Sequence, residues 1–318
     1  MASSSSTTGD RRHYCCFFLA VFLLSSAAHG QLSATFYAAR CSSLDQNVRD
    51  EVSRALFRDP PPLGGRRMGA SLLRLFFHDC FVQGCDASVL LDVDPSKGIL
   101  SSEKDAGPNA NSLRGFEVVD SIKSKVEAAC PGVVSCADIL ALATREAVVA
   151  LNGTTWPLLL GRRDSRTANQ SQANSDLPSP GSNLDTLIAA FARKGFTAPE
   201  LVALSGAHTI GLAHCVNVDQ SQMQRCRVPT ADGLMAELDD HTPERFDSGY
   251  YDKLGKRGLL GSDRVLTSRR DLDALVQKYA ASQAAFFADF GSAMKKMSEV
   301  GVLTGADGEV RTNCRRVN

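Results

Sequence analysis

The sequence predicts a mainly helical, all-α fold with few short strands. Apolar residues recur every three or four positions in several segments, and Leu44, Val48, Val52 and Leu56 form one such stripe. This spacing places side chains on one face of an α-helix. Strict alternation of apolar and polar residues, which is typical of half-buried strands, is not sustained anywhere in the chain.

The other helices follow in chain order from the same spacing and from helix start signals. Three pairs at capping-box spacing precede apolar runs: Ser135 with Asp138, Ser182 with Asp185, and Thr197 with Glu200. Further apolar stripes lie in residues 116–126, 272–279 and 286–297. Clusters of Gly, Pro and polar residues predict loops at 59–67, 93–109, 161–180 and 228–242.

The composition is that of an ordinary globular protein. Of 318 residues, 43% are hydrophobic and 22% are charged, which excludes a disordered chain and a coiled-coil rod. The 35 basic and 35 acidic residues cancel, so no overall field attracts nucleic acid or an anionic membrane. We therefore expect a monomer that binds neither nucleic acid nor membrane.

The first 30 residues have the organisation of a secretory signal peptide. Arg11 and Arg12 precede a short apolar run at residues 15–24, which is followed by small residues up to Gly30. A membrane anchor or a buried helix is the alternative interpretation, but the apolar run is short for a bilayer span. We expect residues 1–30 to be removed, leaving one domain over residues 31–318 that is secreted to the extracellular space or cell wall.

Cysteine usage agrees with secretion. Without the predicted signal peptide eight cysteines remain, and an even number in an exported chain predicts four disulfides. Spacing alone leaves their pairing open. Zinc binding is the alternative interpretation, but Cys-x2-Cys and His-x3-His spacings are missing from the sequence. Asn152 and Asn169 begin triplets that accept N-linked glycans.

One predicted helix carries a permanent cation and a titratable base on the same face. Arg74 and His78 lie four residues apart, with Leu75, Phe76 and Phe77 between them. Burying a charge in such apolar surroundings is costly unless the charge has a use, so the pair is a candidate for acid–base chemistry. The alternative is an arginine paired with a remote carboxylate and a solvated histidine.

A cluster of oxygen-bearing residues follows directly. Asp79, Asp86 and Ser88 surround Gly84 in a short loop, and hard oxygen ligands of this kind favour calcium. An ordinary acidic surface loop is the alternative interpretation.

A second notable histidine, His208, lies among small and apolar residues. A lone histidine in such a setting is more often a hydrogen-bonded core residue than a ligand. His214 and His241 are expected to be structural or exposed.

Five blocks of sequence together resemble a known family. They begin at Arg74 (Arg-Leu-Phe-Phe-His-Asp-Cys-Phe-Val-Gln-Gly-Cys-Asp-Ala-Ser), Glu103 (Glu-Lys-Asp-Ala-Gly-Pro-Asn), Val134 (Val-Ser-Cys-Ala-Asp), Leu160 (Leu-Gly-Arg-Arg-Asp-Ser) and Leu204 (Leu-Ser-Gly-Ala-His-Thr-Ile-Gly). In this order they resemble the secretory plant peroxidases, the class III haem peroxidases, and the resemblance covers residues 31–318. It implies the plant-peroxidase-like fold, with a haem between distal and proximal helical halves.

The resemblance implies one haem b per chain. His208 matches the axial ligand of the haem iron, and Asp263 matches the carboxylate that accepts the other ring N–H of that histidine. Such a partner makes the imidazole more electron-donating. Phe77 is expected to pack over the haem.

On the opposite, distal side, His78 matches the residue that takes a proton from hydrogen peroxide and returns it to the leaving oxygen. Arg74 matches the residue that stabilises the developing charge. Asn109 matches the residue that holds His78 by its other ring nitrogen. The carbonyl of Pro178 matches a contact with the reducing substrate.

Two calcium ions per chain are also implied. The distal ligand set is Asp79, Val82, Gly84, Asp86 and Ser88, with Glu103 linking the distal network toward it. The proximal set is Thr209, Asp239, Thr242, Arg245 and Asp247; Val82, Gly84 and Arg245 would use their carbonyls. Asp79 and Thr209 each follow one of the two histidines directly, so calcium would fix both histidines relative to the haem.

The family's disulfide pattern implies the pairs Cys41–Cys130, Cys80–Cys85, Cys136–Cys314 and Cys215–Cys226. Between Cys215 and Cys226 only ten residues intervene, which is considerably shorter than usual for the family. A segment shortened at this position could disturb the proximal calcium site and weaken the retention of haem.

The implied function is that of a secreted peroxidase that reduces hydrogen peroxide to water. It would oxidise phenolic donors in one-electron steps, as in lignin or suberin formation, the response to oxidative stress and peroxide removal. One alternative is a non-catalytic calcium- or cell-wall-binding member that has lost stable haem; another is a haem enzyme that generates oxygen radicals from auxin or NADH. The sequence ends four residues after Cys314, without the tail linked to vacuolar sorting in relatives, which favours the extracellular space.

Overall fold

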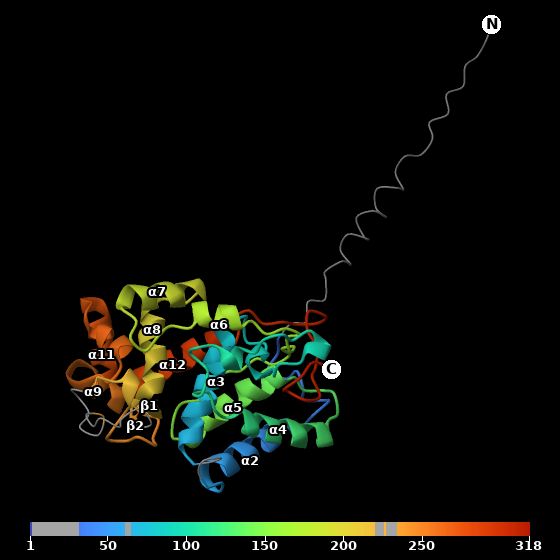
Figure 1. Ribbon diagram of the computed structural model, residues 1–318, viewed down its shortest axis with the longest axis horizontal. Coiled ribbons are helices and arrows are strands. Elements are labelled where there is room, and N and C mark those ends of the chain that lie inside the picture. Colours follow the sequence, from blue (N-terminus) through green and yellow to red (C-terminus); the bar gives the residue numbers. More distant parts are fainter. Residues whose placement is uncertain (2–31, 61–64, 220–225, 227–233) are drawn as a thin grey trace.

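The computed structural model describes residue 1 and residues 32–60, 65–219, 226 and 234–318 (Figure 1). The predicted signal peptide and the expected new N-terminus at residue 31 therefore lie outside the described residues, apart from Met1. Across the described parts of the chain, no helix combines the length and the apolar character needed to cross a membrane.

The described residues are mainly helical, which confirms the predicted fold class. The helices are α2 (Leu44–Phe57), α3 (Arg67–Cys80), α4 (Phe116–Ala129), α5 (Cys136–Ala150), α6 (Gln170–Asp176), α7 (Leu184–Arg193), α8 (Ala198–Ser205), α9 (Gly249–Arg257), α10 (Gly261–Arg264), α11 (Arg270–Ala281) and α12 (Gln283–Met297). Short 3-10 turns include Ser88–Leu90, Glu103–Asp105 and Gly206–Thr209. Strands β1 (Leu212–His214) and β2 (Met235–Glu237) pair antiparallel, with Ala213 opposite Ala236.

Helix α5 is the centre of the first group of helices. Most of its residues are buried, and it packs against α2, α3 and α4. Ser135 begins the helix as predicted, because its hydroxyl accepts the backbone N–H of Asp138 at 3.2 Å. Thr144 ties α5 to α3 by donating to the carbonyl of Leu72 at 3.2 Å.

A second group of helices packs around α8, α11 and α12. Its core is rich in aromatic rings, and Tyr251, Tyr279 and Phe286 lie in mutual contact there. Figure 1 shows α2, α4 and α5 on one side of α3, and α7, α8, α9 and α11 on the other. Helix α3 is therefore the member of the first group that faces the second, which positions its residues for a site between the two groups.

Three details of the predicted elements differ from the structure. Strand β2 lies within the segment predicted as a loop at 228–242. Helix α7 begins one residue later than the Ser182 signal predicts, because Asn183 caps it by accepting the N–H of Thr186 at 2.9 Å. The predicted loop at 161–180 contains the short helix α6, in which Ala173 is the only buried residue. A helix with so little buried surface leaves no apolar periodicity in the sequence.

Candidate active site

A cavity of about 740 Å³ lies between α3 and the end of α8. Both histidines singled out in the sequence line it, His78 from α3 and His208 from the 3-10 turn after α8. Arg74, Phe77 and Pro178 also line it. The structure thus brings residues from distant parts of the chain to one cavity.

His78 is held in one orientation by Asn109. The Nδ1 atom of His78 lies 2.5 Å from the Oδ1 atom of Asn109, whose Nδ2 atom donates to the backbone carbonyl of Glu103 at 2.8 Å. Because the amide group is fixed by this second bond, its oxygen faces the imidazole and accepts a hydrogen bond from the Nδ1–H group. The Nε2 atom is therefore the unprotonated nitrogen of His78.

The environment also keeps His78 neutral. Burial, together with the positive charge of Arg74, lowers the pKa of His78 to about 3. The side chain is thus a free base at physiological pH. A neutral imidazole with Nε2 available is what a proton acceptor requires.

Arg74 lies one helical turn before His78 and is fixed by the loop that carries Asn109. Its guanidinium donates to the carbonyls of Pro108 at 2.9 Å and Ser112 at 3.0 Å, and to the Ser112 hydroxyl at 3.1 Å. Burial lowers the pKa of Arg74 to about 10, which leaves it cationic near neutral pH. A fixed cation therefore stands beside the neutral base.

On the other side of the cavity, His208 is paired with a carboxylate. The Nδ1 atom of His208 lies 2.9 Å from the Oδ1 atom of Asp263, which is buried at the start of α10. Burial lowers the pKa of His208, but the charge and hydrogen bond of Asp263 outweigh it and raise the pKa above its ordinary value. With Nδ1 engaged, Nε2 is the nitrogen of His208 that can bind a metal.

These residues fit a haem. His78 on α3 and His208 in the turn after α8 both line the cavity, and each has its Nδ1 atom engaged by a fixed partner. Phe77 and the other apolar residues of α3 and α8 supply walls suited to a flat, largely apolar ring system. An imidazole with a carboxylate partner is a donor set that suits haem iron.

The predicted distal calcium ligands come together beside α3. Asp79 accepts the backbone N–H of Ala87 at 2.9 Å, and Asp86 accepts that of Ser88 at 3.0 Å. The hydroxyl of Ser88 and the Oε2 atom of Glu103 are buried, and neither has a hydrogen-bond partner within the described parts of the chain. Such orphaned oxygens fit a site for a cation.

The carboxyl groups of this cluster resist ionisation when no cation is present. Burial raises the pKa of Asp86 to about 6 and that of Glu103 to about 7. Burial and the neighbouring charge of Asp86 raise the pKa of Asp79 well above its ordinary value. A bound divalent cation would remove this cost.

Two backbone oxygens of the distal set have other partners. The carbonyl of Val82 accepts from Gln172 at 2.5 Å and from Lys194 at 2.8 Å, so calcium would have to displace a donor there. The carbonyl of Gly84 accepts the N–H of Asp86 at 2.8 Å. Among the described residues, no three His, Cys, Asp or Glu side chains form a metal site by themselves, so calcium would also need hydroxyl and carbonyl oxygens.

The predicted proximal calcium ligands also lie together. The Thr242 hydroxyl contacts carboxylate oxygens of Asp239 at 3.1 Å and of Asp247 at 3.2 Å, and the Thr209 hydroxyl lies 3.4 Å from Asp247. Arg245 lies between them in sequence, and its N–H donates to the carbonyl of Thr242. These oxygens meet although the segment between Cys215 and Cys226 is short.

The structure contains all four disulfides that the resemblance implies. They are Cys41–Cys130, Cys80–Cys85, Cys136–Cys314 and Cys215–Cys226. The shortened segment therefore still closes on itself.

Several residues of the cavity were not singled out in the sequence. Arg67 and Ser71 precede Arg74 and His78 on the cavity-lining face of α3, at spacings that could have indicated them. His214, which was expected to be structural or exposed, also lines the cavity, from β1. Its position depends on how β1 pairs with β2, which no local sequence signal reports.

Comparisons with known proteins identify the family to which the chain belongs. A family model described as Peroxidase matches residues 48–282. The chain is 50% identical to Peroxidase 2 of Oryza sativa subsp. japonica over 312 residues, which cover 93% of this chain and 95% of that protein. It is 48% identical to Peroxidase 67 of Arabidopsis thaliana over 316 residues, covering 94% of this chain and 97% of that protein.

A third relative, Peroxidase 70 of Zea mays, is 48% identical over 311 residues, covering 92% of this chain and 94% of that protein. The chain belongs to the peroxidase family, and it is a peroxidase. The alternative of a non-catalytic binding protein is not favoured by these matches.

Proposed function

We propose that this peroxidase holds one haem b in the cavity between α3 and α8 and couples the reduction of hydrogen peroxide to the oxidation of phenolic donors. One observation carries the proposal. His78 and His208, two of the histidines that line the cavity, each have an Nδ1 atom engaged by a fixed partner, so each can present Nε2 to the same space. His208 would bind the iron, and His78 would face it from the other side.

The bound haem supplies the redox-active iron at which the O–O bond of peroxide is broken. His78 would accept a proton at Nε2 from one oxygen of hydrogen peroxide and deliver it to the other oxygen, which would leave as water. Arg74 stabilises the negative charge that develops as the bond breaks. Asn109 keeps His78 in the tautomer that this transfer requires.

The reducing substrate enters where Pro178 and Gly107 line the cavity. Each phenol gives up one electron and one proton, so two phenols supply what one peroxide needs to become two waters. A Cβ atom added at Gly107 would have one neighbour within 4 Å among the described residues, the Oδ1 atom of Asn174 at 3.5 Å, so this edge leaves space for an aromatic donor.

We propose that the distal and proximal oxygen clusters each bind one calcium ion. The buried orphaned oxygens of Ser88 and Glu103 support the distal ion. The meeting of Thr209, Thr242 and Asp247 supports the proximal ion. We also propose secretion after removal of residues 1–30, with Asn152, which is exposed, as the better-placed glycan acceptor. The Asn169 side chain instead caps α6 by accepting the N–H of Gln172 at 2.9 Å.

An absorbance scan followed by a turnover assay tests the proposed function. Protein secreted by a plant cell line should show the intense Soret band of a bound haem. It should also oxidise a phenolic dye only when hydrogen peroxide is added. Protein that stays colourless after addition of hemin would contradict the proposal and restore the non-catalytic alternative. N-terminal sequencing of the same sample tests whether the mature chain begins at residue 31.

A further inference from the structure

The loop that carries the proposed distal calcium ligands contains one residue in an unfavourable backbone conformation. Ala87 lies between the ligands Asp86 and Ser88 and has a φ of 60°, in the left-handed region. Residues other than glycine rarely adopt this region because the Cβ atom approaches the carbonyl oxygen. Something outside the loop must therefore hold Ala87 in place.

Two hydrogen bonds hold this residue from opposite sides. Its N–H donates to the Oδ2 atom of Asp79 at 2.9 Å. Its carbonyl accepts from the Nη2 atom of Arg311 at 2.6 Å, across more than two hundred residues of sequence. The first partner is itself a proposed calcium ligand, whereas the second comes from the C-terminal arm, which we define as residues 309–318.

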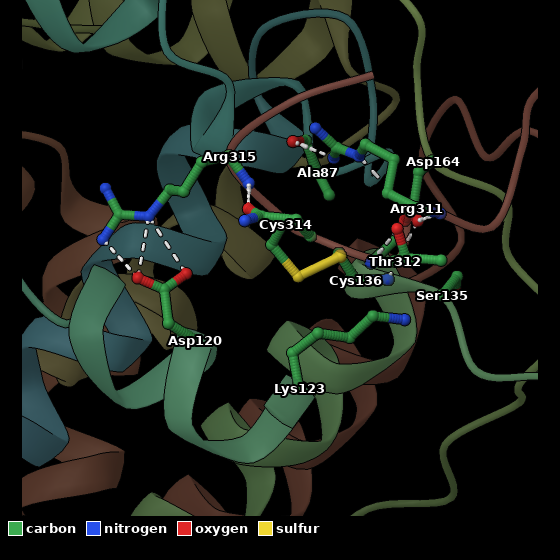
Figure 2. The surroundings of a disulfide bond; sticks show 12 residues. Ala87, Asp120, Lys123, Ser135, Cys136, Asp164, Arg311, Thr312, Cys314 and Arg315 are labelled. Atoms are coloured by element: carbon green, nitrogen blue, oxygen red, sulfur yellow. Dashed lines mark hydrogen bonds and ion pairs between the residues drawn. A yellow bond between two sulfur atoms is a disulfide. The ribbon is translucent and has the colours of Figure 1, made fainter. Parts of the chain in front are cut away.

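Arg311 is anchored at both its backbone and its side chain. Its backbone N–H donates to Asp164 at 2.9 Å, and its Nε atom lies 3.8 Å from the same carboxylate. Asp164 also accepts the N–H groups of Cys136 and Ala137 at the start of α5. Figure 2 shows the Cys136–Cys314 disulfide fastening the same arm to the same end of α5.

The guanidinium of Arg311 is completely buried, and its Nε and Nη1 atoms have no hydrogen-bond partner among the residues that the structure describes. Leaving buried donors unpaired is costly. The guanidinium faces the buried carboxylate of Asp164 at 3.8 Å, and its hydrogen bond goes to the carbonyl of Ala87. The hydrogen bond from the Arg311 guanidinium to the Ala87 carbonyl therefore indicates a role for this side chain in holding the loop.

We propose that Arg311 is a positioning residue for the distal calcium site: it holds Ala87 in the left-handed conformation and thereby sets Asp86 and Ser88 in the geometry that binds the ion. This inference rests on the proposed distal calcium site. The C-terminal arm, locked to α5 by Cys136–Cys314, becomes part of the calcium site without supplying a ligand.

Calcium release from the holoenzyme tests this role. The wild type and Arg311→Met are mixed with excess EGTA, and the ions released are followed with a fluorescent calcium indicator. We expect one calcium ion per chain to be released about tenfold faster from Arg311→Met than from the wild type. This ratio corresponds to a difference of about 1.4 kcal/mol in the activation free energy of release. Release at the wild-type rate overturns the inference. Slower release also overturns it, because that is the result of removing a cation that only repels the ion.

A matched control lies on the same arm. Arg315 pairs with Asp120 on α4 through both carboxylate oxygens and points away from Arg311 (Figure 2). Arg315→Met should release calcium at the wild-type rate. Equal acceleration in both variants would mean that the arm stabilises the protein generally and would overturn the specific role.

A rescue experiment separates positioning from general stability. Glycine adopts the left-handed region without cost, so Ala87→Gly added to Arg311→Met should return calcium release toward the wild-type rate. No recovery would contradict the proposed role of Ala87. If Arg311→Met does not fold, Arg311→Lys carries the test, because it keeps the charge with a less suitable donor; we expect an intermediate rate, and wild-type release would overturn the inference.

A wild-type enzyme that releases no calcium would overturn both the proposed distal site and this inference. A wild-type enzyme that releases calcium, with no effect of Arg311→Met, would overturn the inference alone.

Discussion

His78 and His208 differ in the partner of one ring nitrogen atom, and this difference separates their proposed roles. The Nδ1 atom of His78 faces a neutral amide oxygen, whereas that of His208 faces a carboxylate. The amide fixes orientation and leaves the imidazole a neutral base, because burial dominates its pKa. The carboxylate raises the pKa of His208 and increases its electron donation to a metal.

His78→Ala should keep the haem but react slowly with hydrogen peroxide. Loss of a positioned general acid–base residue typically costs about 10²–10⁴-fold in rate. Stopped-flow absorbance in the Soret region measures the bimolecular rate constant with peroxide. His241→Ala, which changes an exposed histidine, is the matched control and should react as the wild type. A normal rate constant in His78→Ala would remove His78 from the mechanism.

His208→Ala should alter the absorbance spectrum and weaken haem retention, because the iron loses its protein ligand. Asp263→Asn should retain the haem but change the spectrum less, since an amide can still accept from Nδ1 without supplying a negative charge. Haem transfer to an excess of apomyoglobin measures retention in each variant. An unchanged spectrum in His208→Ala would refute the assignment of the axial ligand.

At the residue scale, sequence spacing alone predicts that Arg74 and His78 share one helix face. It does not predict the hydrogen-bond partners of the histidines. The pairing of His78 with Asn109 joins a helix to a loop, and that of His208 with Asp263 spans 55 residues. Neither of these pairings can be predicted from the periodicity of a single helix. These partners were predicted only through the resemblance to a family, and the structure brings both into contact.

Among the elements, helix α8 has the most direct effect on the site, because it leads into the turn that carries His208. A complete capping box begins it: Glu200 donates its backbone N–H to Thr197 at 3.4 Å and accepts the N–H of Thr197 at 2.7 Å. The Glu200 carboxylate also pairs with Lys296 on α12. The start of α8 is thereby tied to a neighbouring helix.

Thr197→Ala should lower the free energy of unfolding by about 1 kcal/mol, which is typical for loss of an N-cap hydroxyl. Thr197→Ser retains the hydroxyl and should remain close to the wild type. Urea denaturation followed by far-UV circular dichroism measures both variants. Equal stability of the alanine and serine variants would show that the cap contributes nothing here.

Element prediction succeeded where helices bury a continuous apolar face, as α2 and α12 do. It failed for α6, whose formation depends on Asn169 at its start and on contacts with the turn at Glu103–Asp105 rather than on buried surface. The start of α7 differed because Asn183 and Ser182 are both capable caps, and only the three-dimensional structure selects between them.

At the scale of the whole molecule, the two proposed calcium clusters are joined to the cavity by the chain itself. Asp79 follows His78 and Thr209 follows His208, so each cluster includes the residue next to one of the histidines. A ligand that binds only the folded state stabilises it by mass action. Calcium should therefore support both the fold and the position of each imidazole.

Removal of calcium with EGTA should lower the midpoint of thermal unfolding. At a free calcium concentration of one hundred times the dissociation constant, the loss for one site is about 2.7 kcal/mol. The reaction with peroxide should slow in parallel as the histidines lose their support. Adding calcium back should restore both, whereas magnesium, which prefers a smaller octahedral site, should not. Unchanged stability in EGTA would contradict calcium binding at these clusters.

The cavity is bounded by two groups of helices, and each group contributes one imidazole. The distance between His78 and His208 therefore depends on how the two groups of helices pack against each other. No short segment of backbone sets this distance. A substitution in the core around α5 could change this distance in a protein that still folds and still binds haem through His208. Misplacement of reacting groups by about 1 Å costs on the order of 10²-fold in rate. Impaired turnover in this enzyme can therefore originate far from any group that touches substrate.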